Sequence, residues 1–153
     1  MLVNKIMHRI NPLTPETNLK EAALLMRNEH LGFTPITNKS GKLVGVITDR
    51  DIAIRAAANN ANMEKSVVKD FMTPEVIACY ENSDLEEAIR LMKLKQVHRL
   101  IVLNNEKEKK IVGVLSLNDI AKKCKTKDTK NLAWQVACFR SEGLKEGQTT
   151  TRH

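Results

Sequence analysis

An internal duplication constrains the fold of this chain more than any other feature of its sequence. The segment Gly45–Ala53 recurs as Gly113–Ala121, and the segment Asn18–Met26 recurs as Asp84–Met92. The distance along the chain between these segments is slightly longer in the second copy than in the first. The extra length falls in a polar stretch between the segments, where a surface turn accepts insertions. The duplication therefore predicts two copies of one structural unit.

Each copy predicts the same order of elements, which is a short strand, a helix, a β-hairpin and a second helix. The first helix is indicated by apolar residues at helical spacing in both copies, namely Leu19, Ala22, Ala23 and Met26, and Leu85, Ala88, Ile89 and Met92. The hairpins are indicated by pairs of apolar runs around polar turns, at residues 33–37 and 43–48 and at residues 99–103 and 111–116. The second helices are expected at residues 49–58 and 117–125.

These elements predict an α/β fold made of two repeats, residues 1–62 and residues 63–125. Neither repeat is long enough to bury its helix faces alone, so we expect the two to pack together with pseudo-two-fold symmetry. Residues 126–153 have no counterpart in the duplication. We expect a C-terminal helix at residues 128–140 that folds back on the core, followed by a disordered tail from residue 144.

The composition limits the classes of function. The net charge is +7, from 25 basic and 18 acidic residues, but no segment concentrates the surplus. Only 3% of the residues are aromatic, which disfavours a stacking platform for single-stranded nucleic acid. The sequence contains no signal peptide pattern and no apolar run that could span a bilayer. We therefore expect a soluble, cytoplasmic protein that binds neither nucleic acid nor membrane.

The duplicated motif Gly-x-x-Thr/Ser-x-x-Asp stands where a strand ends and a helix begins. Thr48 with Asp51, and Ser116 with Asp119, have the spacing of a capping box that satisfies the free N–H groups of a helix. The same groups suit a nucleotide, because a helix start attracts phosphate and an aspartate accepts from ribose hydroxyls. The glycines would let a ligand approach the backbone closely. The two interpretations are compatible, and the motif leaves both open.

Two copies of this unit, each ending in the motif, resemble a tandem pair of CBS domains over about residues 1–125. The resemblance implies a module with two clefts between the repeats that bind adenosine-containing ligands, such as AMP, ADP, ATP or S-adenosylmethionine. It implies that Thr48 and Asp51 in one cleft, and Ser116 and Asp119 in the other, hold phosphate and ribose. The remaining site residues that it implies are backbone contacts to adenine and cations for phosphate, namely Thr34, Pro35, Ile36, Leu100, Ile101 and Val102, and Arg50 and Arg99. The second copy has Asn118 in place of Arg50.

No pattern of a catalytic or metal site is present in the sequence. The four histidines and three cysteines have no metal-ligand spacing, and no phosphate-binding glycine loop or nucleophile motif occurs. We therefore expect a non-enzymatic regulatory module without an obligatory cofactor, which signals ligand occupancy to an effector protein or to its own oligomer. The resemblance implies a homodimer, with the second helices as candidate contacts. An interaction scaffold with empty clefts remains the alternative.

Overall fold

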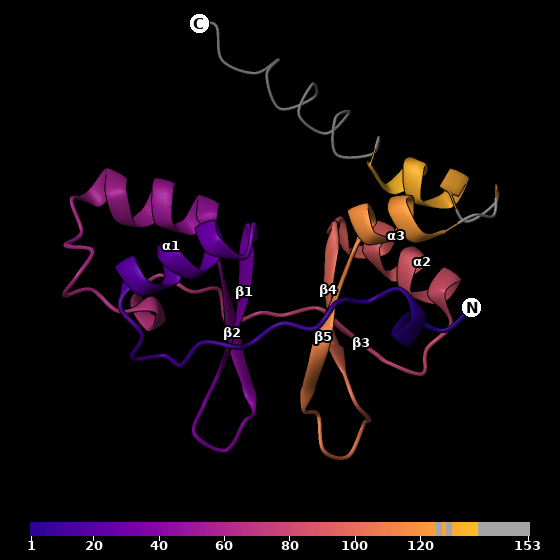
Figure 1. Ribbon diagram of the computed structural model, residues 1–153, viewed down its shortest axis with the longest axis horizontal. Helices are drawn as coiled ribbons and strands as arrows, with labels where there is room; N and C mark the ends of the chain where they lie inside the picture. The colour runs from indigo at the N-terminus through magenta and orange to yellow at the C-terminus, as the bar shows by residue number, and fades with distance from the viewer. Residues whose placement is uncertain (125–126, 128–129, 138–153) are drawn as a thin grey trace, which may run out of the picture. The chain divides into compact units, whose positions relative to one another are not determined.

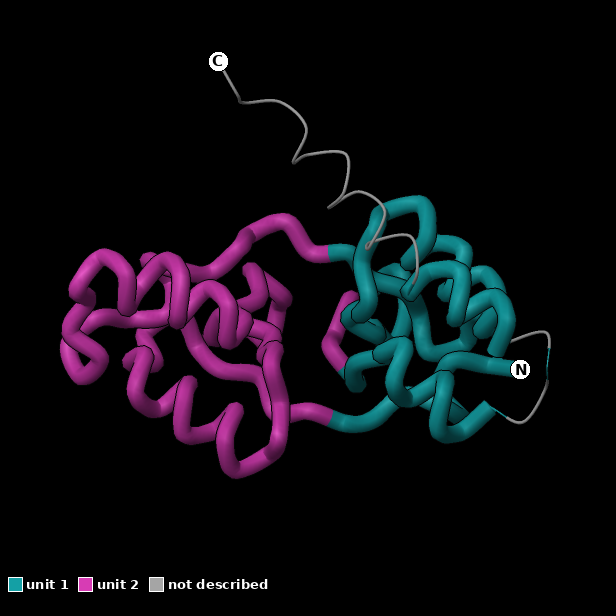
Figure 2. The backbone as a smooth tube through the Cα atoms, turned by 90° about the horizontal axis from the view of Figure 1, so that it is seen from above, with its two compact units in different colours: residues 1–9, 77–107, 112–153 teal, residues 10–76, 108–111 magenta. Residues whose placement is uncertain are grey.

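The chain forms two compact units, which Figure 2 shows in different colours. The computed structural model describes residues 1–124, 127 and 130–137. Unit 1 comprises residues 1–9, residues 77–107 and the described residues from 112 onward, and unit 2 comprises residues 10–76 and 108–111. Both units combine helices and strands, which confirms the predicted α/β class. The predicted packing of one repeat on the other stays a prediction.

Unit 2 is built on an antiparallel hairpin and a helix (Figure 1). Helix α1 (Leu19–Asn28) begins where Asn18 Oδ1 accepts a hydrogen bond from Glu21 N at 2.8 Å. Such an N-cap contributes about 1 kcal/mol to helix stability. Strands β1 (Phe33–Thr37) and β2 (Leu43–Thr48) pair with each other over the residues expected for the hairpin.

The second helical segment of unit 2 departs from a regular α-helix. Residues 49 and 50 are α-helical, η2 (Asp51–Ala56) is a π-helix, and η3 (Ala57–Asn59) is a 3-10 turn. The segment ends at Asn60, whose φ of 55° turns the chain out of the helix. The predicted helical region at residues 49–58 is confirmed, but its type is not. Single π-turns are rare and frequently stand at functional sites.

Unit 1 contains a three-stranded sheet with the helices α2 and α3. Strand β4 (Arg99–Leu103) lies between β3 (Ala78–Tyr80), which is parallel to it, and β5 (Ile111–Ser116). Helix α2 (Leu85–Lys95) precedes β4, and helix α3 (Leu117–Lys123) follows β5. The predicted order of strand, helix, hairpin and helix is therefore confirmed in this unit.

The short first strand is much reduced in unit 2. Its place is taken by Leu13, which forms a single parallel bridge with Ile36 of β1. The corresponding pair in unit 1 is Cys79 of β3 with Val102 of β4. The offset along the chain from Leu13 to Cys79, and from Ile36 to Val102, equals the offset between the two first helices. The duplication therefore includes this strand.

The opening segments of the two sequence repeats are exchanged between the compact units. The segment that contains η1 (Val3–Lys5) belongs to unit 1, where Val3 and Ile6 enter the same apolar core as α2 and α3. The segment that contains η4 (Val68–Asp70) belongs to unit 2, where Val68 enters the core beneath α1. The predicted boundaries at residues 1–62 and 63–125 thus describe the sequence duplication, whereas the compact units divide the chain differently.

Two glycines accommodate the exchanged segments. Val46 and Thr73 exchange backbone hydrogen bonds of 2.9 and 2.8 Å beside Gly45, and Val114 and His8 do the same beside Gly113 at 2.9 and 3.0 Å. A Cβ atom on Gly45 would lie 2.8 Å from Thr73 O, and one on Gly113 would lie 2.5 Å from His8 O. The expectation that these glycines admit a ligand to the backbone is therefore corrected. The space that they leave is taken by the chain itself.

The C-terminal helix is confirmed over the part that the structure describes. Residues 130–137 are helical, and Ala133 and Val136 are buried in the core of unit 1. Trp134 lies on the opposite side and is 70% exposed. The ends of the predicted helix, including Phe139, and the expected tail from residue 144 lie outside the described residues. No helix among the described residues is long and apolar enough to cross a membrane.

We expect Gly113→Ala to lower the free energy of unfolding by about 1–3 kcal/mol, the range for overpacking a well-packed site. The new methyl group would collide with a backbone carbonyl, which cannot rotate away. Gly45→Ala should act in the same direction, and urea denaturation measures both. Gly32→Ala is the matched control, because its Cβ would meet only the side chain of Asp49. A loss for Gly113→Ala no greater than that for Gly32→Ala would contradict this explanation.

We expect Thr34→Val to raise the free energy of unfolding by about 1 kcal/mol. Thr34 is fully buried, and its Oγ1 has no hydrogen-bond partner among the described residues. An unsatisfied buried hydroxyl carries a desolvation cost that a methyl group of similar size removes. Thermal or urea denaturation measures the change, with Thr37→Val as a control on the same strand. Destabilisation by Thr34→Val would show that the hydroxyl has a binding partner in solution.

Candidate functional site

In unit 2, Thr48 and Asp51 form a closed set of hydrogen bonds at the end of β2. Asp51 Oδ2 accepts from Thr48 N at 2.9 Å and from Thr48 Oγ1 at 2.9 Å, and Asp51 N donates to Thr48 Oγ1 at 3.0 Å. The other carboxylate oxygen, Oδ1, lies 3.7 Å from Arg55 Nη1, and the Asp51 side chain is 14% exposed. The carboxylate is therefore held in one orientation with an edge still open to solvent.

In unit 1, Ser116 and Asp119 form the same arrangement at the end of β5. Asp119 Oδ2 accepts from Ser116 N at 3.0 Å, and Asp119 N donates to Ser116 Oγ at 3.1 Å, which completes a capping box. His8 Nδ1 lies 2.9 Å from the same Oδ2 atom. Within the described part of the chain, Asp119 Oδ1 has no partner. The capping interpretation of the motif is thus confirmed in both copies, and one oxygen of Asp119 stays available.

The start of each first hairpin strand lies beside its junction. In unit 2 the antiparallel register places Phe33 opposite Thr48, and Asp49 N donates to Gly32 O at 3.1 Å. In unit 1 Leu117 N donates to His98 O at 3.1 Å, immediately before β4. Each unit therefore brings the start of its first hairpin strand to its motif, whereas in unit 2 the register places Thr34, Pro35 and Ile36 successively farther from Thr48.

The implied adenine-contacting residues expose almost none of their surface, backbone included. Thr34, Pro35 and Ile36 are buried, and so are their counterparts Leu100, Ile101 and Val102. Part of this backbone is already engaged, since Pro35 O accepts from Leu13 N at 2.9 Å and Ile101 N donates to Ile77 O at 3.1 Å. The first residues of each strand are therefore better placed for a ligand than the central ones.

The two arginines implied to bind phosphate are exposed and make no ion pair with the residues that the structure describes. Arg50 and Arg99 lie on the surface, and the guanidinium groups of both make no ion pair with any described residue. Arg50 directly precedes Asp51, whereas the corresponding residue in unit 1 is the uncharged Asn118. The two junctions also differ in charge at two other matched positions, since unit 1 has Leu117 for Asp49 and Arg99 for Phe33.

Several residues at these junctions escape prediction from the sequence. Arg55 Nη1 donates to Phe71 O at 2.7 Å in unit 2, and Lys123 Nζ donates to Ile6 O at 2.7 Å in unit 1. Each cation thus ties the exchanged segment to the helix that carries the motif aspartate. The signal that could have identified them is the duplication itself, because Arg55 and Lys123 stand at matched positions after the two motif aspartates. His8 gave no such signal, because it contacts Asp119 from 111 positions away.

The described residues hold neither a grouped set of metal ligands nor an exposed cysteine. They contain no cluster of three potential metal ligands among His, Cys, Asp and Glu. Burial raises the pKa of the Cys79 thiol to about 12, which keeps it in the thiol form at neutral pH. Cys124 is also buried, and burial raises its pKa as well.

Known proteins resemble this chain over most of its length. The CBS domain-containing protein YhcV of Bacillus subtilis is 32% identical over 113 residues, which cover 74% of this chain and 77% of that protein. The match covers 54% of an uncharacterised protein of Methanopyrus kandleri and 21% of an inosine-5'-monophosphate dehydrogenase of Methanocaldococcus jannaschii. The chain thus corresponds to only part of some longer relatives.

Solved structures of similar fold include proteins with bound ligands. The CBS domain pair of protein MJ0100, in complex with 5-methylthioadenosine and S-adenosyl-L-methionine, is 28% identical with a TM-score of 0.66, covering 80% of this chain and 94% of that one. Hypoxic Response Protein I, with two coordinated zinc ions, is 26% identical with a TM-score of 0.71, covering 81% of this chain and 99% of that one. The family profile of the CBS domain matches residues 3–57 and 68–125. Since these residues include both copies of the duplicated unit, the chain belongs to the CBS domain family.

Proposed function

We propose that this chain is a ligand-sensing regulatory module that binds adenosine-containing ligands at its two strand-to-helix junctions. The observation that supports this most directly is the state of the two motif carboxylates. In each junction one oxygen is fixed by the cap while the other points away from it, and Asp119 Oδ1 has no partner among the described residues. The ligands of the MJ0100 domain pair are adenosine derivatives. Their ribose hydroxyls can donate hydrogen bonds to such a carboxylate oxygen.

The roles of the surrounding groups follow from the same geometry. Thr48 and Ser116 hold the carboxylates and can turn their hydroxyls toward a phosphate or ribose oxygen. For adenine to contact the backbone of Thr34–Ile36 and of Leu100–Val102, the groups that bury it have to move aside, and Arg50 and Arg99 neutralise phosphate. Unit 1 has Asn118 in place of Arg50 but Arg99 in place of Phe33, so the cation for phosphate stands at a different position in each junction. The two sites therefore differ in preference among AMP, ADP, ATP and S-adenosylmethionine.

The proposed output is a change in how the module engages a partner. A ligand shifts a conformational equilibrium only through different affinities for its states, so occupancy acts on an effector protein or on the homodimer of this chain. The second helices, predicted at residues 49–58 and 117–125, remain our candidates for the dimer contact. The proposal includes neither an enzymatic activity nor an obligatory cofactor.

The second candidate is an interaction scaffold whose junctions bind no ligand. The specific observation in its favour is that the cap hydrogen bonds account for the motif completely, with Oδ2 of both aspartates fully used. In this interpretation Thr48, Asp51, Ser116 and Asp119 only start helices. The two candidate functions differ in the expected effect of removing the aspartate charge on ligand affinity.

We expect Asp51→Asn and Asp119→Asn each to abolish or weaken by at least about tenfold the binding of AMP, ATP or S-adenosylmethionine at its own junction. Asparagine keeps a carbonyl acceptor for the cap but loses the charge, and hydrogen bonds to a charged group are worth about 1.5–3 kcal/mol. Isothermal titration calorimetry measures the affinity and the number of sites, starting from two in the unmodified protein.

Asp49→Asn is the matched control, because Asp49 is an exposed neighbour of Asp51 and its loss changes the net charge equally. It should leave the affinity unchanged. If none of the three ligands binds the unmodified protein while the aspartate variants lose only thermal stability, the scaffold is the correct function. Equal weakening by Asp49→Asn would mean that overall charge, and not the junction, governs binding.

A further inference from the structure

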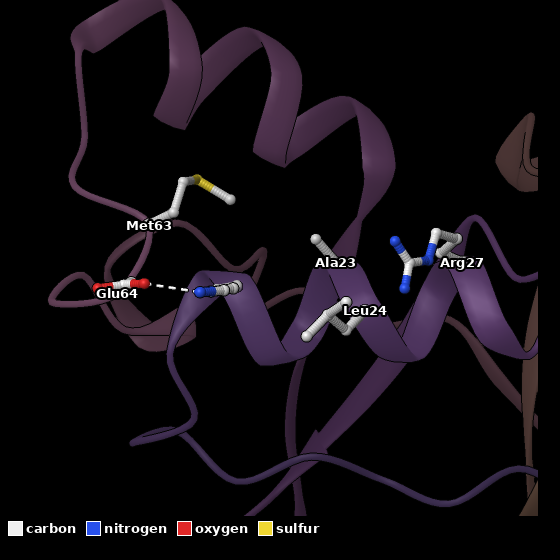
Figure 3. Close-up of a pocket in the computed structure, with 6 residues that line it drawn as sticks. Ala23, Leu24, Arg27, Met63 and Glu64 are labelled. Carbon is white, nitrogen blue, oxygen red and sulfur yellow. Dashed lines mark hydrogen bonds and ion pairs between the residues drawn. The ribbon is translucent and has the colours of Figure 1, made fainter.

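A groove on unit 2 is separate from the residues of the β2–η2 junction. It lies between α1 and the segment that contains Met63 and Glu64, and Figure 3 shows the residues that line it. Its volume of about 470 Å³ falls within the roughly 300–1,000 Å³ typical of small-molecule sites. The lining consists of four residues of α1 and two of the facing segment, namely Lys20, Ala23, Leu24, Arg27, Met63 and Glu64.

One end of the groove is closed by an ion pair. Lys20 Nζ lies 2.6 Å from Glu64 Oε1, and this contact raises the pKa of Lys20 and lowers the pKa of Glu64. Two backbone hydrogen bonds hold the facing segment against the start of α1, from Lys20 N to Met63 O at 2.9 Å and from Leu19 N to Ser66 O at 3.0 Å. The charges of Lys20 and Glu64 therefore neutralise each other, and the backbone hydrogen bonds hold their two segments together.

The other end of the groove presents a single uncompensated cation. Figure 3 shows Arg27 at the end away from Glu64, with its side chain directed along the groove. The Arg27 guanidinium makes no hydrogen bond or ion pair with any residue that the structure describes. A guanidinium fork matches a carboxylate or a phosphate with two parallel hydrogen bonds. The groove therefore complements one negative group at this end.

The floor between the two ends is apolar, and the fold does not require it to be. Ala23 and Leu24 of α1 and Met63 of the facing segment line it, and Leu24 is 37% exposed. In the duplicated helix α2 the position that corresponds to Leu24 is Arg90, which lies 3.7 Å from Glu86 in a surface ion pair. Because the same helix accepts an arginine at this place in unit 1, the exposed leucine in unit 2 is not explained by packing.

We propose that this groove binds a small amphiphile with one carboxylate or phosphate group and a short apolar body. The negative group pairs with Arg27, and the apolar body covers Leu24 and Met63 up to the Lys20–Glu64 pair. Only one cation is available for the head, since the charge of Lys20 is already neutralised. The proposal does not depend on the proposed nucleotide function, because none of the lining residues belongs to either junction.

Octanoate is a suitable probe, and the Met63 methyl group is a built-in reporter. In ¹³C-methyl-methionine-labelled protein, octanoate should shift the Met63 resonance in a saturable way, whereas octylammonium, with the same chain and the opposite charge, should not. Arg27→Gln and Leu24→Gln should each weaken octanoate binding by about tenfold, which corresponds to the loss of a charged hydrogen bond or of buried apolar area. Octyl phosphate in place of octanoate identifies the preferred head group.

Arg90→Gln is the matched control, because it removes one arginine from the equivalent helix of unit 1 and changes the net charge equally. It should leave octanoate binding unchanged. The proposal is overturned if octanoate leaves the Met63 signal unmoved, if Arg27→Gln binds as tightly as the unmodified protein, or if Arg90→Gln weakens binding to the same degree. It is also overturned if the Met63 signal shifts with protein concentration alone, which would identify the groove as a contact between copies of the chain.

Discussion

The close approach of two backbones at Gly113 and at Gly45 is the constraint on which both units depend. At each place a strand of one sequence repeat exchanges two hydrogen bonds with the opening segment of the other repeat, and neither pairing leaves room for a Cβ atom. The paired segments carry apolar side chains into the cores, such as Val3 in unit 1 and Val68 in unit 2. Neither sequence repeat therefore contains all the residues that fill its own core.

The same pairing connects the cores to the candidate sites. The exchanged segments end beside the motif helices, where Arg55 and Lys123 bind their carbonyl groups and His8 contacts Asp119. A carboxylate that is already oriented by its cap loses little freedom when it accepts a ribose hydroxyl, which lowers the cost of binding. The cap is thus compatible with a binding role and supplies the rigidity that such a role requires.

The sequence was sufficient to predict features that depend on local pattern. The hairpins at residues 33–48 and 99–116 follow from apolar runs and turn residues, and the caps at Thr48 and Ser116 follow from residues within one helical turn. The exchange of opening segments was not predicted, because the contact between His8 and Val114 joins positions far apart in the chain and local periodicity carries no information about it. The π-helical form of residues 51–56 was also missed, since its apolar spacing suits a regular helix equally well.

Because of the duplication, each unit can be compared with the other. The comparison separates residues that the shared fold requires from residues that serve a role in one unit alone. Residues that agree between the copies, such as the motif aspartates and their hydroxyl partners, satisfy a geometry that both units share. Where the residues differ but the backbone is the same, the fold does not require either residue. His8 and Thr73, which occupy matched positions beside the paired strands, are one such case. Leu24 against Arg90 on the first helices is a second case, and Arg50 against Asn118 at the junctions is a third. Chemistry that is particular to this chain is therefore expected at these differing positions, whereas the shared residues define the family fold.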